Sequence, residues 1–124
     1  MRAIRYLLAI AVVTLALCSA VLGADDILVE DFESEGYGQW TAEGEAFGPG
    51  PAAGTLPNQM EVTGYRGDRL VNSYHGGDDK TGTLTSPEFT IRRDYINFLI
   101  GGGGYEDTTC MKLLVGGKAV RTAS

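Results

Sequence analysis

The sequence predicts an all-β protein, an antiparallel β-sandwich of the jelly-roll or lectin-like type. From residue 24 onward, apolar runs of about 4 to 8 residues alternate with clusters of Gly, Pro, Asn and Asp at intervals of about 8 to 12 residues. The 18 glycines of the 124-residue chain suit the many turns that such a fold needs. No helical pattern follows residue 24, so short strands joined by tight loops are expected.

Each predicted strand is an apolar run bounded by turn-forming residues. In the run 40–47, the even-numbered residues from Trp40 onward are apolar or glycine and alternate with polar ones, which is typical of a half-buried strand. Trp40 is therefore a core candidate. The run 95–100 is apolar on both faces except for Asn97, so we expect a central strand covered on both sides. The full set of predicted strands is 27–33, 40–47, 59–62, 69–74, 82–86, 88–91, 95–100, 110–115 and 118–123.

Two consecutive glycines, Gly116 and Gly117, separate the last two predicted strands. They suit a two-residue hairpin turn, because both central residues of a type I′ turn need positive φ. The last predicted strand then runs almost to Ser124 with no further strand to cover its edge. We therefore expect a sandwich that is incomplete at its C-terminus, with its other strands and a further domain downstream.

Residues 1–23 have the pattern of a secretory signal peptide, which would place a helix before the sandwich module of residues 24–124. Arg2 and Arg5 precede an apolar run at 7–17, and small residues follow it. A single membrane anchor is the alternative, but the apolar run is shorter than the roughly 20 residues that span a bilayer. The prediction is a secreted or periplasmic protein, free of the membrane after cleavage.

Charge and cysteine content narrow the function classes. After cleavage, eight basic and sixteen acidic residues remain, which gives a net charge of −8. This balance disfavours a nucleic-acid partner, because phosphate binding needs a basic surface. Cys110 becomes the only cysteine, so no intramolecular disulfide can form. It lies in an apolar run, where cysteine most often acts as a small buried hydrophobe.

The segment "SYHGGDDKTGTLTSPEF" contains the main candidate site residues: Tyr74, His75, Asp78 and Asp79. His75 is the only histidine, and zinc needs three or four protein ligands, so no zinc site is predicted. A structural calcium at the two aspartates stays open, although no helix-flanked calcium loop is present. The glycines of this segment favour a turn between two strands. We expect no cofactor, and no residue is assigned a catalytic role.

Two glycine-rich or proline-rich segments are predicted to be loops. "GGGGYED" at 101–107 lacks the lysine of a phosphate-binding loop and is followed by a strand-like run, so it is interpreted as an inter-strand loop. The segment 47–59 holds three of the four prolines and is predicted to be a long ordered loop. Loops of that length within a compact domain are often functional.

The strings "LVNSYHGGDDKTGTLTSPEFTI" and "YINFLIGGG" resemble the β-sandwich module that precedes the catalytic domain in levanase-type enzymes of glycoside hydrolase family 32. The resemblance runs from about Val29 to Ser124. In that family, hydrolysis of β-fructosidic bonds resides in a five-bladed propeller, with carboxylates in Asn-Asp-Pro, Arg-Asp-Pro and Glu-Cys motifs. None of these motifs occurs here, since Tyr95 follows Arg93 and Asp94 where the family has proline. The resemblance therefore implies an accessory module without the catalytic residues.

The functional expectation is an accessory module of a secreted fructan-active glycoside hydrolase. Its expected partners are a fructan or another polysaccharide and a downstream catalytic domain. If the module holds sugar, the four candidate residues around His75 would make the contact. The alternative is a free-standing secreted sandwich with a structural or adhesion role and no sugar-specific function.

Overall fold

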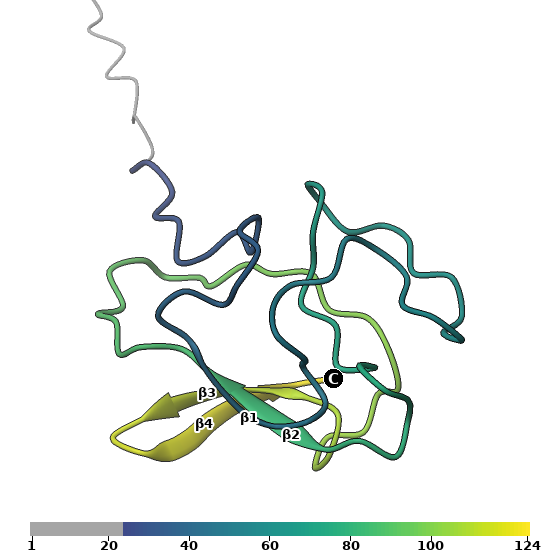
Figure 1. Cartoon of the computed structure of the whole chain (residues 1–124). Helices are drawn as coiled ribbons and strands as arrows, with labels where there is room; N and C mark the ends of the chain where they lie inside the picture. The colour runs from purple at the N-terminus through teal and green to yellow at the C-terminus, as the bar shows by residue number, and fades with distance from the viewer. Residues whose placement is uncertain (1–23) are drawn as a thin grey trace, which may run out of the picture.

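A computed structural model describes residues 24–124, and the predicted signal peptide lies outside these residues. The described part is all-β, with two antiparallel sheets of two strands each and no helix (Figure 1). β1 (Thr41–Gly44) pairs with β2 (Gly82–Thr85), and β3 (Met111–Val115) pairs with β4 (Lys118–Ala123). The predicted all-β class is confirmed. Within residues 24–124 there is no helix long and apolar enough to cross a membrane.

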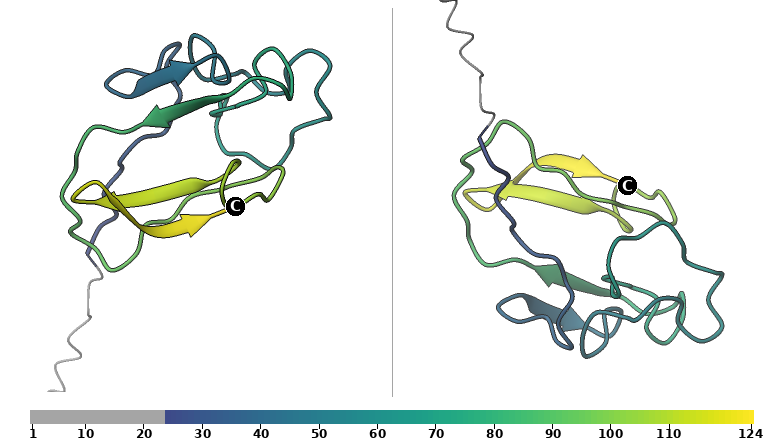
Figure 2. Two further views of the ribbon diagram at one scale, coloured as in Figure 1. Left: turned by 90° about the horizontal axis from the view of Figure 1, so that it is seen from below. Right: turned by 90° about the horizontal axis from the view of Figure 1, so that it is seen from above.

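The two sheets form separate layers, joined by long irregular segments (Figure 2). An open space of about 4050 Å³ is lined by residues of β2, of the β3–β4 hairpin and of segments within 24–33, 58–74 and 86–104. In a closed β-sandwich, side chains from the two inner faces interdigitate and fill this layer. Here apolar side chains that line the space remain exposed, among them Leu114 at 51% and Val115 at 53%.

β1 ends at Gly44 because the backbone turns there. Gly44 has a φ of +79°, a left-handed conformation that interrupts a strand, and Gly82 lies directly opposite it in the register. Beyond this point the backbone N–H groups of Glu45 and Ala46 both donate to the carbonyl of Thr81, at 2.9 and 3.2 Å. The predicted strand 40–47 is therefore shorter than expected.

The predicted burial of the 40–47 run is only partly correct. Ala46 is buried and Trp40 is half-buried, but every residue of β1 is exposed. Ala42 is opposite Leu84 in the register, and Leu84 lines the open space. Trp40 instead packs against Phe32, with ring centroids 4.9 Å apart in an edge-to-face arrangement.

The β3–β4 hairpin forms as predicted. Gly116 and Gly117 have φ values of +56° and +74°, and Val115 is paired with Lys118, which leaves these two glycines as the loop. A β-bulge interrupts the register between Leu113 and Leu114. Cys110, expected to be buried, is half-buried just before β3.

Several predicted strands are absent from the described part of the chain. The runs 27–33, 59–62, 88–91 and 95–100 form no strand, and 69–74 contributes only a bridge from Leu70 to Ala52. The prediction of a central strand at 95–100 is wrong in burial too, since Tyr95 is 81% exposed. A strand needs a neighbouring backbone to pair with, and outside the strands no backbone hydrogen bond between two main-chain groups involves residues 86–104.

The packed part of the molecule is the first half of the described chain. Tyr37 is buried, and its hydroxyl donates to the carbonyl of Phe47 at 2.8 Å. Burial also raises the pKa of this phenol. Phe32 contacts the ring of Tyr37 as well as Trp40, with an interplanar angle of 78° for the tyrosine pair. Tyr37 and Ala46 also contact the two loops that form the pocket, through the carbonyl of Phe47 and the N–H of His75.

Candidate ligand pocket

The proline-rich loop 47–59 folds back onto residues 69–77, and this contact creates the pocket. Ala52 and Leu70 exchange backbone hydrogen bonds of 2.8 and 2.9 Å, so the two segments are bridged as in an antiparallel pair. One guanidinium nitrogen of Arg69, Nη1, also donates to the carbonyl of Pro51 at 3.1 Å. The loop is thus ordered, as its proline content predicts, although only the bridge resembles a strand.

A reciprocal pair of side-chain amides fixes the two segments further along. Gln59 Nε2 donates to Asn72 Oδ1 at 3.0 Å, and Asn72 Nδ2 donates to Gln59 Oε1 at 2.8 Å. The same two oxygens accept backbone N–H groups of Leu56 and Tyr74, each at 3.0 Å. Asn72 is buried, so this network satisfies a polar group that would otherwise be costly to remove from water.

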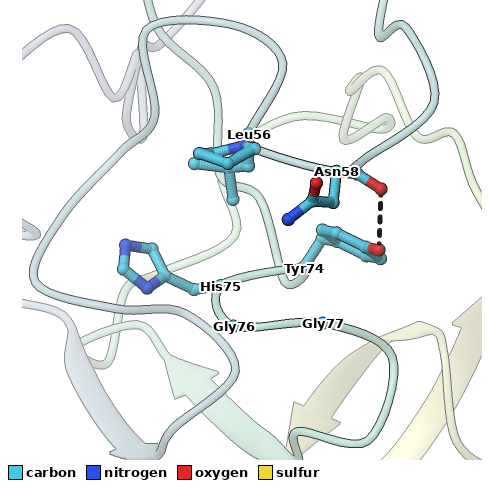
Figure 3. A pocket seen from close by; sticks show the side chains of 7 residues that line it. Leu56, Asn58, Tyr74, His75, Gly76 and Gly77 are labelled. Atoms are coloured by element: carbon cyan, nitrogen blue, oxygen red, sulfur yellow. Dashed lines mark hydrogen bonds between the residues drawn. The ribbon is translucent and has the colours of Figure 1, made fainter.

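The pocket lies directly beside this amide pair. Leu56 and Asn58 lie on one side, and the run from Tyr74 to Gly77 lies on the other (Figure 3). Pro57 also lines the pocket. Its volume is about 510 Å³, within the roughly 300 to 1,000 Å³ of typical small-molecule sites. The Tyr74 hydroxyl donates to the backbone carbonyl of Asn58 at 3.0 Å and so ties the walls together.

His75 is held by its backbone and by a close approach to glycine. Its N–H donates to the carbonyl of Ala46 at 3.0 Å, and its imidazole lies against Gly48, where a Cβ atom would collide with the ring. Figure 3 shows the imidazole pointing away from the ring of Tyr74. The imidazole is exposed, so it is free to donate or accept a hydrogen bond at the pocket.

The predicted turn at "HGGDDKTG" is confirmed as two successive turns. The Gly77 N–H donates to the Tyr74 carbonyl at 3.0 Å, and the Lys80 N–H donates to the Gly77 carbonyl at 3.3 Å. Gly76 and Gly77 have φ values of +90° and +110°, which side-chain-bearing residues rarely adopt.

The structure separates the four candidate residues into two groups. Tyr74 and His75 line the pocket, whereas Asp78 and Asp79 are exposed and do not line it. Asp78 instead lines the open space. Among residues 24–124, there is no group of three or more His, Cys, Asp or Glu side chains that could hold a metal ion.

The opposite wall was missed by the sequence analysis. The composition of 47–59 indicated an ordered loop of a kind that is often functional, but it did not single out Leu56, Pro57 or Asn58. Their position depends on the contact of Gln59 with Asn72, which are 13 residues apart. The only sequence signal was the proline content of the loop.

One ion pair lies next to these turns. Lys80 Nζ contacts Glu45 Oε2 at 2.8 Å, and both side chains are exposed. The pKa of Glu45 is lowered below its ordinary value, first by the hydrogen bond from Lys80 and second by the positive charge of Lys80. The pKa of Lys80 is raised, first by its hydrogen bond to Glu45 and second by the negative charge of Glu45.

Replacing Lys80 with alanine should return the pKa of Glu45 toward that of a free glutamate. Because the folded-state pKa of Glu45 is depressed, its stabilising contribution is present above the unfolded-state pKa and is lost as pH falls through the folded-state value. An NMR titration of the Glu45 side chain in both proteins measures this difference. At high salt the two titrations should converge, because exposed pairs are screened. A Glu45 pKa that Lys80→Ala leaves unchanged would contradict this interpretation.

The described residues combine an all-β fold with a small pocket between two loops, lined by apolar and polar groups. Residues of this chain are 39% identical over 103 residues to the "Putative glycosyl hydrolase ecdE" of Aspergillus rugulosus. The match covers 81% of this chain but only 15% of that protein, so the chain spans less than a sixth of its relative. The similarity relates the chain to a glycoside hydrolase. No protein-family model and no solved structure matches it.

Proposed function

We propose that residues 24–124 form a non-catalytic, carbohydrate-binding accessory module of a secreted glycoside hydrolase that acts on fructans. The observation that carries this proposal is the 39% identity to a glycosyl hydrolase over most of the chain. The assignment to family 32 and to fructans rests on the resemblance of "LVNSYHGGDDKTGTLTSPEFTI" to levanase-type proteins. Secretion rests on the signal-peptide pattern of residues 1–23.

The chemistry of the pocket supports binding without hydrolysis. Hydrolysis of a glycoside uses two carboxyl groups on either side of the scissile bond. No aspartate or glutamate lines the pocket. The nearby Glu45 has a lowered pKa, which is the opposite of what a general acid needs. A sugar held here would therefore be bound and not cleaved by groups of this pocket.

The pocket offers both kinds of contact that a sugar requires. Tyr74 supplies an aromatic ring, and its hydroxyl is fixed by Asn58, so little side-chain freedom is lost on binding. The exposed imidazole of His75 and the side-chain amide of Asn58 supply hydrogen-bonding groups for hydroxyls. Trp40 is engaged with Phe32 and does not line this pocket.

Affinity electrophoresis in gels that contain levan or inulin tests the proposal directly. We expect migration of the chain to be retarded, and we expect His75→Ala to weaken binding by about tenfold, equivalent to about 1.4 kcal/mol. Asp79→Asn is the matched control, because Asp79 lies in the same loop but does not line the pocket. Dextran serves as the control polysaccharide.

The outcomes separate the proposal from its alternatives. Equal retardation of the His75 and Asp79 variants would mean that the polysaccharide does not bind in the pocket. Absence of retardation on every polysaccharide would favour the structural or adhesion role. Incubation of the chain with levan should release no fructose, and release of fructose by the chain alone would contradict a non-catalytic role.

A further inference from the structure

The open space exposes large apolar side chains that a β-sandwich ordinarily buries. Phe98 is 46% exposed and Ile100 is 48% exposed, although both lie in one of the most apolar runs of the chain. Leaving such surface in water forfeits the hydrophobic stabilisation that its burial would give. The exposed apolar residues that line the space are Ile27, Leu28, Val29, Met60, Phe89, Ile91, Tyr95, Ile96, Phe98, Leu99, Ile100, Tyr105, Met111, Leu114 and Val115. We call this set the open face.

The backbone of the open face is also unpaired. The segment 86–104 makes no backbone hydrogen bond to another main-chain group outside the strands, and each sheet has only two strands, so its outer edges are free. In the run 95–100, Ile96, Phe98 and the residues between and after them all line the open space, so the exposed apolar surface continues along the run. An isolated two-stranded hairpin is marginally stable, and three or more strands are needed for independent stability. The open face therefore has both the edges and the side chains to accept further strands.

We propose that the open face is completed by extended apolar polypeptide from the remainder of a longer glycoside hydrolase chain, which adds strands beside 95–100 and β3. This inference rests on the proposed function, because it takes the module to be part of such an enzyme. The length of the relative supports this occupant: the matched 103 residues make up only 15% of ecdE, so the related stretch there is accompanied by several times its own length of polypeptide. Strand addition satisfies the free backbone groups and buries the open face in one step.

A second copy of this chain fits the open face less well. Residues 24–124 carry a net charge of −8, from eight basic and sixteen acidic residues, and two copies would bring these charges together. The β3–β4 hairpin carries Lys112, Lys118 and Arg121, and no acidic side chain occurs between residues 108 and 124. The structure thus favours incoming strands with apolar residues at alternate positions and acidic residues next to this hairpin.

Hydrogen exchange on two proteins tests the proposal. The first is the chain of residues 24–124 alone, and the second is ecdE with its matched 103 residues replaced by the corresponding residues of this chain. Amides of 95–100 and of β3 should be protected about 100-fold more strongly in the chimera than in the chain alone. Within the chimera, Phe98→Asp should abolish that extra protection. Val120→Asp, at an exposed apolar position of β4 that does not line the open space, should preserve it.

Each other outcome overturns the proposal. Equal protection in a monomeric chain alone would mean that the open face closes without added strands. Protection that rises with the concentration of the chain alone, together with a dimer in light scattering, would identify a second copy as the occupant. An unprotected open face in the chimera would exclude the remainder of the enzyme. Retardation of the same chimera on levan is measured separately, so a failure of the fructan assignment is distinguishable from a failure of strand addition.

Discussion

Replacing Gly44 with alanine should lower the free energy of unfolding by about 2 to 4 kcal/mol, from backbone strain and overpacking together. Gly44 has a φ of +79°, and an added Cβ would collide with the carbonyl oxygen of Thr81 and lie 2.8 Å from the Cα of Gly82. Both obstacles are backbone atoms, so a side-chain rotation cannot relieve the collision. Urea unfolding followed by the fluorescence of Trp40, the only tryptophan, measures the change.

Gly64→Ala is the matched control for that experiment. Gly64 has nearly the same φ, +81°, but a Cβ there would meet no atom within 4 Å. Its replacement should cost about 1 kcal/mol, which is the conformational penalty alone. If the two variants were equally destabilised, the close approach of β1 to the Thr81 region would have no energetic role, and the account of where β1 ends would be wrong.

The features that could be predicted from sequence are those that depend on a few neighbouring residues. The Gly116–Gly117 turn and the strands beside it needed only two glycines between apolar runs. The turns around Gly76 and Gly77 were predictable for the same reason. The end of β1 at Gly44 could not be predicted in this way. The alternation of apolar and polar residues in 40–47 continues past Gly44, although the backbone changes direction there.

The missing strands show what periodicity cannot supply. The run 95–100 has the composition of a buried strand. Such a composition indicates only that the segment would be favourable in a sheet with its side chains buried. Whether the strand forms depends on a second backbone beside it. Among residues 24–124 no backbone pairs with this run, so it forms no strand despite its composition.

The pocket was partly predictable for a related reason. Tyr74 and His75 belong to a polar segment with the only histidine of the sequence and two following aspartates, but neither aspartate lines the pocket. The opposing wall depends on a tertiary contact between two amides, and no local pattern encodes which glutamine meets which asparagine. Asparagine and glutamine are common on surfaces, so Asn72 carried no signal of burial.

The surroundings of the pocket and the open face therefore differ in what stabilises them. Around the pocket, buried polar groups are satisfied by partners within residues 24–124, and the aromatic cluster of Phe32, Tyr37 and Trp40 packs beside them. Around the open face, apolar surface is exposed and backbone edges are free. This difference is what the proposal of added strands at the open face would explain.

Replacing Asn72 with alanine should destabilise the pocket half by about 2 to 3 kcal/mol, because it leaves polar partners unsatisfied. Asn72 is 7% exposed; its amide binds both polar ends of Gln59 and accepts the backbone N–H of Tyr74. Loss of these bonds should release the 47–59 loop from the Tyr74 wall. Trp40 fluorescence in urea measures the stability. Asn97→Ala, at an exposed amide in the unpaired run 95–100, is the control and should change it by less than about 0.5 kcal/mol.

A double-mutant cycle with Gln59→Ala distinguishes a specific amide pair from general loss of packing. If the two side chains act through each other, the double variant should be less destabilised than the sum of the single variants, with a coupling energy of about 1 to 2 kcal/mol. Most of the cost of either single variant is the partner left without a hydrogen bond, and the double variant removes both partners together. Additive effects would mean that the amides stabilise the loops independently. In that case the pocket walls would be held by the Ala52–Leu70 bridge and the Tyr74 hydroxyl instead.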